Sequence, residues 1–408
     1  MKKCAIITPG FLPVPAVLGG AVETLIEELV KSNEKAPKFY IDLYTVPNHK
    51  LNNIKFKYCN IIQVNIRKRH KMYGKIQYLI FRRILKNDED RMSLFGIAVR
   101  ELMVGKKYHY TIIENNAEVF NSIRRQKNMV FHLHNDLDND RPPYLCKKII
   151  KNCICTLSVS KYLAKRMNSI INSSKNKVLY NCVDLDLFNR NNVNIQWREE
   201  FKKNNNIKDG DFIYYFSGRI IDDKGVLELI KAFTYVIKKQ KNAKLIIVGQ
   251  SFFGNNELSK YEKDLYDIAK KDLDKIIFTG YINHNEIPNI LSLADCVIIP
   301  TKTEEAFGVV ALEAMAFGKA IIATNSGGLV EPLENNCAII VEKKDLVNEL
   351  INAMNKIYNN SDLKEKLGKS AYEKVHQVSE FDNKNYFKNF CEIIEGSEDS
   401  ENRKFYKK

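Results

Sequence analysis

The sequence predicts an α/β protein with two parallel-sheet halves. Short apolar runs alternate with amphipathic segments along most of the 408 residues, a pattern typical of parallel sheets. A polar, asparagine-rich stretch, 184–210, interrupts this alternation, which starts again at Phe212. The length suggests two domains, and 45% hydrophobic residues can fill two cores.

Seven strands are expected in the first half, with helices between most of them. The clearest helix carries Val22, Leu25, Ile26, Leu29 and Val30, an i, i+3, i+4, i+7, i+8 stripe. The expected strands are Ala5–Thr8, Ile41–Thr45, Ile61–Val64, Thr111–Glu114, Met129–Leu133, Ile154–Val159 and Val178–Tyr180.

The second half repeats the pattern with six strands. They are Phe212–Ser217, Lys244–Gly249, Lys275–Gly280, Cys296–Pro300, Ala320–Thr324 and Ala338–Val341. A final amphipathic helix is expected from Phe381. The domain boundaries predicted from these changes are 1–190, a linker at 191–210, and 211–380.

The net charge of +15 is concentrated in one stretch. Residues 67–86, RKRHKMYGKIQYLIFRRILK, hold eight Lys or Arg and no acid. Apolar residues recur there at roughly helical spacing: Met72, Ile76, Leu79, Ile80 and Ile84. Such a basic amphipathic helix can lie on an anionic membrane or pack on its own domain, and both readings stay open. Nucleic acid is not expected as a partner, because no recognition motif accompanies the charge.

Other features favour a cytoplasmic protein. The nine cysteines are scattered and odd in number, so buried thiols are expected in place of disulfides or a zinc site. No apolar run approaches the ~20 residues of a membrane span. The apolar start, Cys4–Ile7, is too short for a signal peptide. The basic stretch could still hold such a protein at the inner face of the plasma membrane.

The most informative stretch is PTKTEEAFGVVALEAMAFGKAIIATNSGGLVE, residues 300–331. It carries Glu305 and Glu313 just past the end of a predicted buried strand, where ligands of open α/β sheets bind. If all intervening residues were helical, the carboxylates would lie ~12 Å apart. They would then contact two parts of one long ligand, with a helix N-terminus between them for anionic oxygens. A nucleotide-sugar fits this arrangement.

At this point the sequence resembles a known family, the family 4 (GT4) retaining glycosyltransferases of the "glycosyl transferases group 1" type. EAFGVVALEAMAFGK looks like the family's E-x7-E signature. Cys182 departs from the pattern, because the family usually has glycine there. Five further segments resemble family motifs in the family's order: GGAVE (19–23), HND (134–136), YNCVDLDLF (180–188), SGRIIDDKG (217–225) and SGGLVE (326–331).

The resemblance implies the GT-B fold, with two Rossmann-like domains facing a cleft and a last helix, about 381–408, packing back on the first domain. It implies that Arg219 and Lys224 bind the donor diphosphate, Glu313 the ribose and Glu305 the sugar, with His134 near donor and acceptor. The remaining donor-binding residues implied are Gly19, Gly20, Gly249, Tyr281, Ile282, Ala306, Phe307, Gly308 and Val309.

The resemblance also implies a mechanism without a metal or other cofactor. Asp136, Asp138 and Asp140 alternate as in a cation site but are interpreted as loop acids, and two histidines without a third matched ligand do not make a metal site. The acceptor would attack the sugar on the same face from which the diphosphate leaves, and the leaving phosphate would take the acceptor's proton. The alternative, Glu305 as nucleophile or base, is disfavoured.

The function predicted is therefore a hexosyltransferase. Its donor would be a nucleotide-sugar, with UDP-GlcNAc, UDP-Glc or UDP-Gal preferred. Its acceptor would be a saccharide or lipid-linked saccharide in bacterial cell-surface polysaccharide or glycoconjugate synthesis. Two alternatives are another GT-B enzyme, such as a nucleotide-sugar epimerase, and a non-catalytic glycosyltransferase-like subunit.

Overall fold

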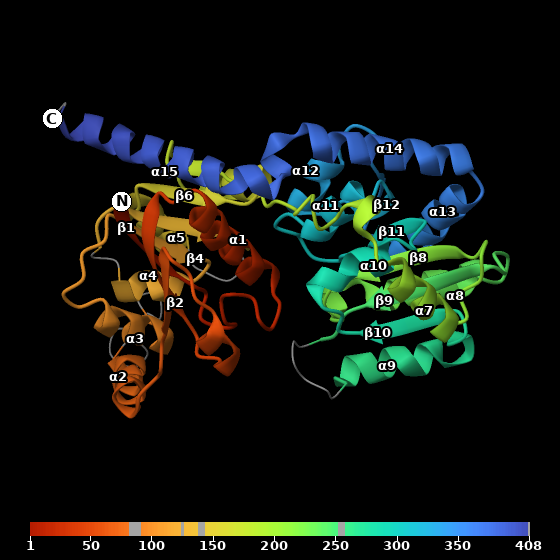
Figure 1. Ribbon diagram of the computed structural model, residues 1–408, viewed down its shortest axis with the longest axis horizontal. Helices are drawn as coiled ribbons and strands as arrows, with labels where there is room; N and C mark the ends of the chain where they lie inside the picture. Colours follow the sequence, from red (N-terminus) through yellow and green to blue (C-terminus); the bar gives the residue numbers. More distant parts are fainter. Residues whose placement is uncertain (81–90, 124–125, 138–142, 252–257, 407–408) are drawn as a thin grey trace. The chain divides into compact units, whose positions relative to one another are not determined.

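The computed structural model describes residues 1–80, 91–123, 126–137, 143–251 and 258–406. The chain divides into two compact units (Figure 1). Unit 1 comprises Met1–Asn181 and Lys384–Lys408, and unit 2 comprises Cys182–Asn383. Each unit is a parallel sheet with helices between its strands, so the α/β class expected from the alternating pattern is confirmed.

Unit 1 contains a seven-stranded sheet in the order β3-β2-β1-β4-β5-β6-β7. All of its pairings are parallel. Strands β4 and β5 are wholly buried and β1 and β2 are mostly buried, which explains why they appear in the sequence as short apolar runs. The strands are β1 (Lys2–Ile7), β2 (Phe39–Thr45), β3 (Cys59–Gln63), β4 (Tyr110–Glu114), β5 (Met129–Leu133), β6 (Cys155–Ser158) and β7 (Asn176–Val178).

The helices of unit 1 lie between these strands in the chain. They are α1 (Ala21–Lys35), α2 (Lys68–Leu79), α3 (Leu94–Leu102), α4 (Ala117–Ile123), α5 (Pro143–Asn152), α6 (Lys161–Ile170) and α15 (Asn383–Tyr406), whose first residue belongs to unit 2. The stripe predicted for α1 faces inward, because Leu25, Ile26, Leu29 and Val30 are buried.

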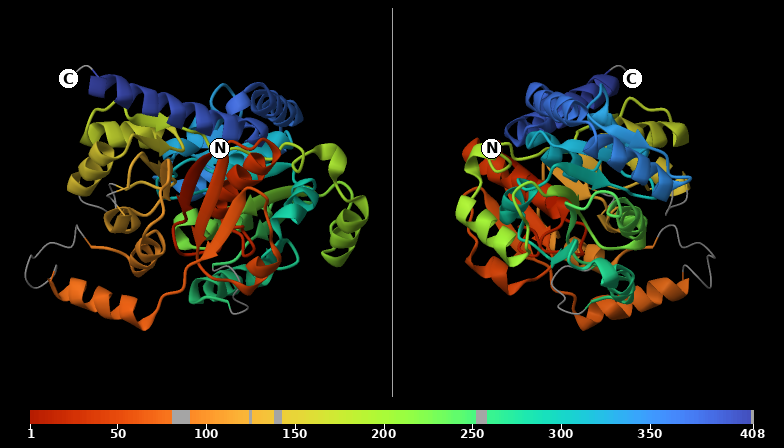
Figure 2. Two further views of the ribbon diagram at one scale, coloured as in Figure 1. Left: turned by 60° about the vertical axis from the view of Figure 1, so that its left-hand side comes forward. Right: turned by 90° about the vertical axis from the view of Figure 1, so that its right-hand side faces the viewer.

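The C-terminal helix α15 packs on unit 1 beside the amino-terminal end of β1 (Figures 1 and 2). Phe387 makes an edge-to-face contact with Phe39 of β2, with 6.1 Å between ring centroids. Glu398 accepts hydrogen bonds from Tyr110 and Lys2, and its Oε1 lies 2.9 Å from Nε2 of His109. A charged cluster and an apolar contact thus attach the end of the chain to the first sheet.

Unit 2 contains a six-stranded parallel sheet in the order β10-β9-β8-β11-β12-β13. Its strands are β8 (Phe212–Ser217), β9 (Ala243–Val248), β10 (Ile276–Gly280), β11 (Cys296–Ile299), β12 (Ala320–Thr324) and β13 (Ile339–Val341). Its α-helices are α7 (Ile195–Asn204), α8 (Val226–Val236), α9 (Lys260–Ala269), α10 (Ile287–Leu291), α11 (Val309–Ala316), α12 (Val330–Leu333), α13 (Leu346–Tyr358) and α14 (Ser361–Gln377).

The expected linker, 191–210, is instead part of unit 2 and carries α7. Its asparagines make caps and contacts. The Asn194 side chain accepts a hydrogen bond from the backbone N–H of Trp197, and the Asn194 N–H donates to the Asn289 side chain, 2.8 Å away. Asparagine is a strong N-cap residue, so this polar composition marked a helix start.

Two further findings concern the whole described chain. All nine cysteines are buried, and among the described residues none is in a disulfide. Among the helices of the described residues, none combines the length and the apolar character that crossing a bilayer requires.

Candidate functional site

The carboxyl ends of β8, β9 and β11 carry loops that touch backbone to backbone. Gly225 has φ 68° and Gly249 has φ 133°. A Cβ at Gly225 would collide with the carbonyl oxygen of Pro300, and one at Gly249 with the carbonyl oxygen of Gly218. Side chains other than hydrogen do not fit at either contact, so both glycines are needed to bring the loops together.

This contact places Lys224 beside Glu305. The Lys224 ammonium donates a hydrogen bond to Glu305 Oε1, and the two side chains are 26% and 17% exposed. Lys224 ends a short 3₁₀ turn, Asp222–Lys224, after β8, while Glu305 lies in the loop after β11. Two residues 81 positions apart thereby form one ion pair at the edge of the sheet.

The loop after β12 supports Glu305 through hydrogen bonds to its backbone. The Glu305 N–H donates to the hydroxyl of Ser326 at 3.1 Å, and that hydroxyl donates to the carbonyl of Thr303. The N–H of Gly328 donates to the Glu305 carbonyl at 2.8 Å. The segment SGGLVE therefore holds the Glu305 loop in place, and Ser326, which the sequence analysis did not single out, is central to this support.

Helix α11 begins directly after this loop. Gly308 is its N-cap, with φ 86°, and Val309 is its first residue. Glu305 thus lies outside the helix, and the spacing calculated for a continuous helix does not apply. Ala306 is partly exposed, whereas Phe307 is buried, with its ring centroid 6.1 Å from that of Phe381.

Glu313 lies within α11 and is 7% exposed. Its Oε1 is 3.2 Å from Nε2 of His284, a residue in the loop after β10 that sequence reasoning missed. The signal that could have found it is HNE (284–286), which follows a predicted strand end as the other site residues do. Burial first, and then the charge of Glu313, raise the pKa of the nearby Tyr215 hydroxyl.

Four other predicted residues lie at or just after neighbouring strand ends. Arg219 follows β8 and is exposed, and among the described residues its guanidinium makes no ion pair. The Gly249 N–H donates to the carbonyl of Gly280 at 3.0 Å, which joins the ends of β9 and β10. Tyr281 and Ile282 come next in the chain, with Tyr281 42% exposed.

The remaining predicted residues belong to unit 1. Gly19 and Gly20 precede α1 with φ 82° and 107°. A Cβ at Gly20 would collide with the carboxylate of Glu23, which folds back toward the start of the helix. Burial raises the pKa of Glu23 above its usual range. The glycines thus allow a tight turn, and in this structure the turn also accommodates a side chain of α1 itself.

His134 follows β5 and forms a buried cluster with Glu114 and His132. Glu114 Oε2 lies 2.9 Å from Nε2 of His134 and 3.0 Å from Nδ1 of His132. Burial alone would raise the pKa of Glu114, but the two imidazoles reverse this and lower it to about 2. Burial, and then the neighbouring His132, lower the pKa of His134 to about 4. Sequence reasoning did not single out Glu114.

Of the acids interpreted as loop residues, Asp136 accepts a hydrogen bond from Nε of Arg166 at 2.8 Å. Asp138 and Asp140 lie outside the described residues, as does the part of the basic stretch from 81 to 86, including Ile84.

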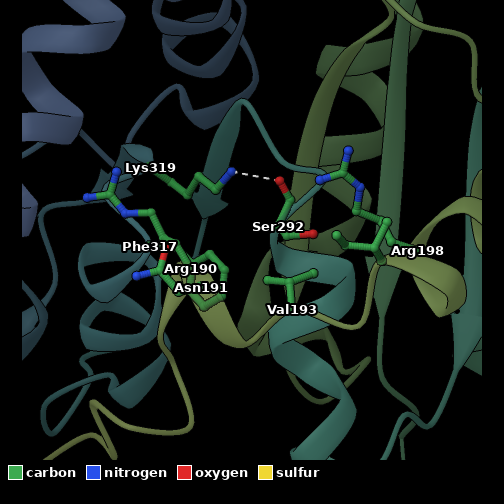
Figure 3. A pocket seen from close by; sticks show the side chains of 8 residues that line it. Arg190, Asn191, Val193, Arg198, Ser292, Phe317 and Lys319 are labelled. Atoms are coloured by element: carbon green, nitrogen blue, oxygen red, sulfur yellow. Dashed lines mark hydrogen bonds between the residues drawn. The ribbon is translucent and has the colours of Figure 1, made fainter.

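A separate cavity of about 390 Å³ in unit 2 contains none of the predicted site residues (Figure 3). Its cations already have partners. The Lys319 ammonium donates to the carbonyls of Ser292 and Ala294 at 2.9 and 2.7 Å, and Arg190 lies 3.9 Å from the ring centroid of Tyr372. The cavity therefore adds nothing to the candidate site.

Known proteins are similar to this chain in sequence and in fold. Residues 197–374 match the family described as "Glycosyl transferases group 1". The chain is 25% identical to a lipopolysaccharide 1,2-N-acetylglucosaminetransferase of Salmonella typhimurium, over 81% of this chain and 82% of the relative. It is 24% identical to spore coat protein SA of Bacillus subtilis, over 90% and 93%.

Among solved structures, HepE from Anabaena in complex with UDP-glucose superimposes with a TM-score of 0.74. The pair is 16% identical, and 97% of this chain and 100% of HepE are covered. This likeness shows the fold, GT-B. The curated relatives, with the match of residues 197–374 to the group 1 family, identify the chain as a glycosyltransferase enzyme.

Proposed function

We propose that this enzyme is a family 4 retaining hexosyltransferase that moves a sugar from a nucleotide-sugar to an acceptor hydroxyl. The observation that carries the proposal is the Lys224–Glu305 pair, held beside the N-terminus of α11 at the carboxyl edge of the unit 2 sheet. A cation, a carboxylate and free helix N–H groups are what a sugar diphosphate requires.

The chemistry assigned to these residues is stabilisation of the leaving diphosphate. Arg219, which has no ion pair among the described residues, and Lys224 would offset its growing negative charge as the anomeric bond breaks. Glu305 would hold sugar hydroxyls, and Glu313 ribose hydroxyls. The pairing of Glu305 with Lys224 favours this binding role over a nucleophile. No metal or other cofactor is assigned a role.

A UDP-sugar is the donor we propose, with GlcNAc, Glc or Gal as the sugar. HepE, which shares the fold, has been solved with UDP-glucose, and the Salmonella relative is named as an N-acetylglucosaminetransferase. The same relative is named for lipopolysaccharide, which supports a saccharide or lipid-linked saccharide acceptor in cell-surface polysaccharide or glycoconjugate synthesis.

Helix α2 supports a cytoplasmic location at the inner face of the plasma membrane. Its two buried residues, His70 and Gln77, are polar, whereas Met72 and Ile76 are 62% and 47% exposed. The apolar side chains thus face away from unit 1, opposite to what packing on its own domain requires. Figure 2 shows α2 at the periphery of unit 1. Exposed Lys71 lies beside the apolar side chains, a combination suited to anionic lipid.

Vesicle sedimentation tests the membrane part of the proposal. Met72→Ser with Ile76→Ser should abolish binding to vesicles of anionic lipid, while Ile195→Ser, a change at an isoleucine of unit 2 that is 70% exposed, should leave it intact. Equal binding to neutral and anionic vesicles, or equal binding by both variants, would contradict it.

Thermal unfolding with UDP-, GDP- and ADP-sugars tests the donor, because a ligand that binds only the folded state raises the midpoint. A shift for UDP-sugars alone, reduced in Arg219→Ala, is expected. NMR of the product should then show the donor's anomeric configuration. An isomerised donor formed without acceptor would instead identify an epimerase, and an inverted product would exclude retention.

A further inference from the structure

The buried carboxylate of Glu114 has no part in the chemistry assigned so far. It ends β4, and its backbone is paired in register with His132 on the neighbouring strand β5. The Glu114 side chain is 0% exposed, and those of His132 and His134 are 1% and 3% exposed. A charge buried this deeply is costly unless it is paired and hydrogen-bonded, so the cluster needs a reason to persist.

One Glu114 oxygen, Oε2, contacts both imidazoles. It lies 3.0 Å from Nδ1 of His132 and 2.9 Å from Nε2 of His134. Since an ionised carboxylate only accepts hydrogen bonds, the facing nitrogen of His134 must carry its proton. The proton therefore sits on Nε2, and Nδ1 of His134 keeps a free lone pair. Among the described residues that buried Nδ1 has no hydrogen-bond partner.

The backbone around His134 is held equally firmly. The Asn115 side chain, next in the chain after Glu114, accepts hydrogen bonds from the N–H groups of His134 and Asn135 at 3.0 and 3.1 Å. Asn115 itself has φ 47°, a left-handed conformation that asparagine tolerates. The turn after β4 thus holds the backbone of His134 through hydrogen bonds to Asn115, while Glu114 contacts the imidazole ring.

We infer that Glu114 is a positioning residue for His134. It selects the neutral tautomer protonated on Nε2 and so fixes the orientation of the ring, with Nδ1 as the remaining acceptor. This inference rests on the proposed function, because it takes His134 to be the residue that contacts substrate. The orienting role of a carboxylate behind a histidine is a general one, and loss of the carboxylate leaves the wrong tautomer.

The test is Glu114→Gln, read by activity and by NMR of ¹⁵N-labelled histidines in the full chain. The glutamine amide can donate to Nε2 of His134, which would move the proton to Nδ1. We expect wild type to show His134 protonated on Nε2 and the variant to lose this signature. The kcat should fall about 10- to 100-fold, with a smaller change in the donor KM.

Glu398→Gln is the matched control. It changes another glutamate–histidine pair of unit 1, Glu398 with His109, and His109 directly precedes β4, the strand that Glu114 ends. We expect it to lower the unfolding temperature and leave kcat within twofold. If Glu114→Gln behaves in the same way, the cluster is structural and the inference is wrong.

Two further outcomes separate the possible failures. If wild type shows His134 protonated on Nε2 but transfers no sugar to any acceptor, the proposed function is wrong. If Glu114→Gln shows the same histidine protonation as wild type, the positioning role is wrong. Stoichiometric zinc in the purified enzyme, with activity lost on chelation and restored by zinc, would show that the three side chains serve as metal ligands and would also overturn it.

Discussion

Replacement of Lys224 by alanine tests the proposed diphosphate site most directly. The structure places this ammonium against Glu305, with both side chains partly exposed. Removal of one preorganised charge from a developing anion typically costs 10²–10³ in turnover, or about 2.7–4 kcal/mol. We therefore expect kcat of Lys224→Ala to fall by about that factor.

The same change should affect stability little. Ion pairs near the surface contribute about 0–1 kcal/mol, so the melting temperature should fall by at most about 2–4 °C for a unit of this size. An activity loss without unfolding would therefore report on the chemistry. Addition of Glu305→Gln to the variant should cost less than Glu305→Gln costs in wild type, because the two residues are in contact and their effects are coupled.

Initial rates of UDP-sugar turnover, with donor affinity from thermal shift, measure both effects. The control is Lys302→Ala, since Lys302 is 29% exposed, close to the 26% of Lys224, and pairs with Asp222 of the loop after β8 and with Glu228 of α8. Turnover of Lys224→Ala within threefold of wild type would refute the reasoning, as would an equal loss in Lys302→Ala.

Three more predictions follow from single contacts. Glu313→Gln should raise the donor KM about tenfold with kcat little changed, measured by steady-state kinetics, because it weakens uniform binding of the ribose. Gly249→Ala should destabilise by about 3 kcal/mol or more in urea unfolding, since its Cβ meets the Gly218 carbonyl; Gly210→Ala, with φ 89° but open space, should cost only about 1 kcal/mol. Hydrogen bonds from neighbouring side chains overcome the effect of burial and lower the pKa of Glu398 to about 2. Wild type should therefore be more stable to unfolding than Glu398→Gln by about 1–2 kcal/mol above pH ~4.3, and this difference should be lost as the pH falls toward 2. Thermal melts of both proteins at several pH values would measure it.

The strand–helix alternation could be interpreted from sequence because its causes are local. Each predicted strand has a counterpart in the structure within a few residues, since buried parallel strands need continuous apolar runs. The enzyme class predicted from the motifs is confirmed by the comparisons. The segment expected as a linker belongs to unit 2 and carries α7, because asparagine favours helix N-caps as well as turns.

The candidate site could be predicted in part. The motifs named Lys224 and Glu305, but not that the two form an ion pair or that Ser326 supports it. His284 and Glu114 were missed because each acts through a partner distant in sequence: Glu313 lies 29 positions from His284, and His134 lies 20 from Glu114.

The sequence by itself determined which segments are strands and which are helices, since these depend on periodicity over a few residues. Only the tertiary structure decided which side chains meet. The register of β4 against β5 brings Glu114 to His132, and the packing of unit 1 turns Met72 outward and His70 inward. Which side chains meet, and which face inward, depends on contacts between segments far apart in the chain. The energy of each contact is set by the surrounding residues, so no local sequence pattern predicts it.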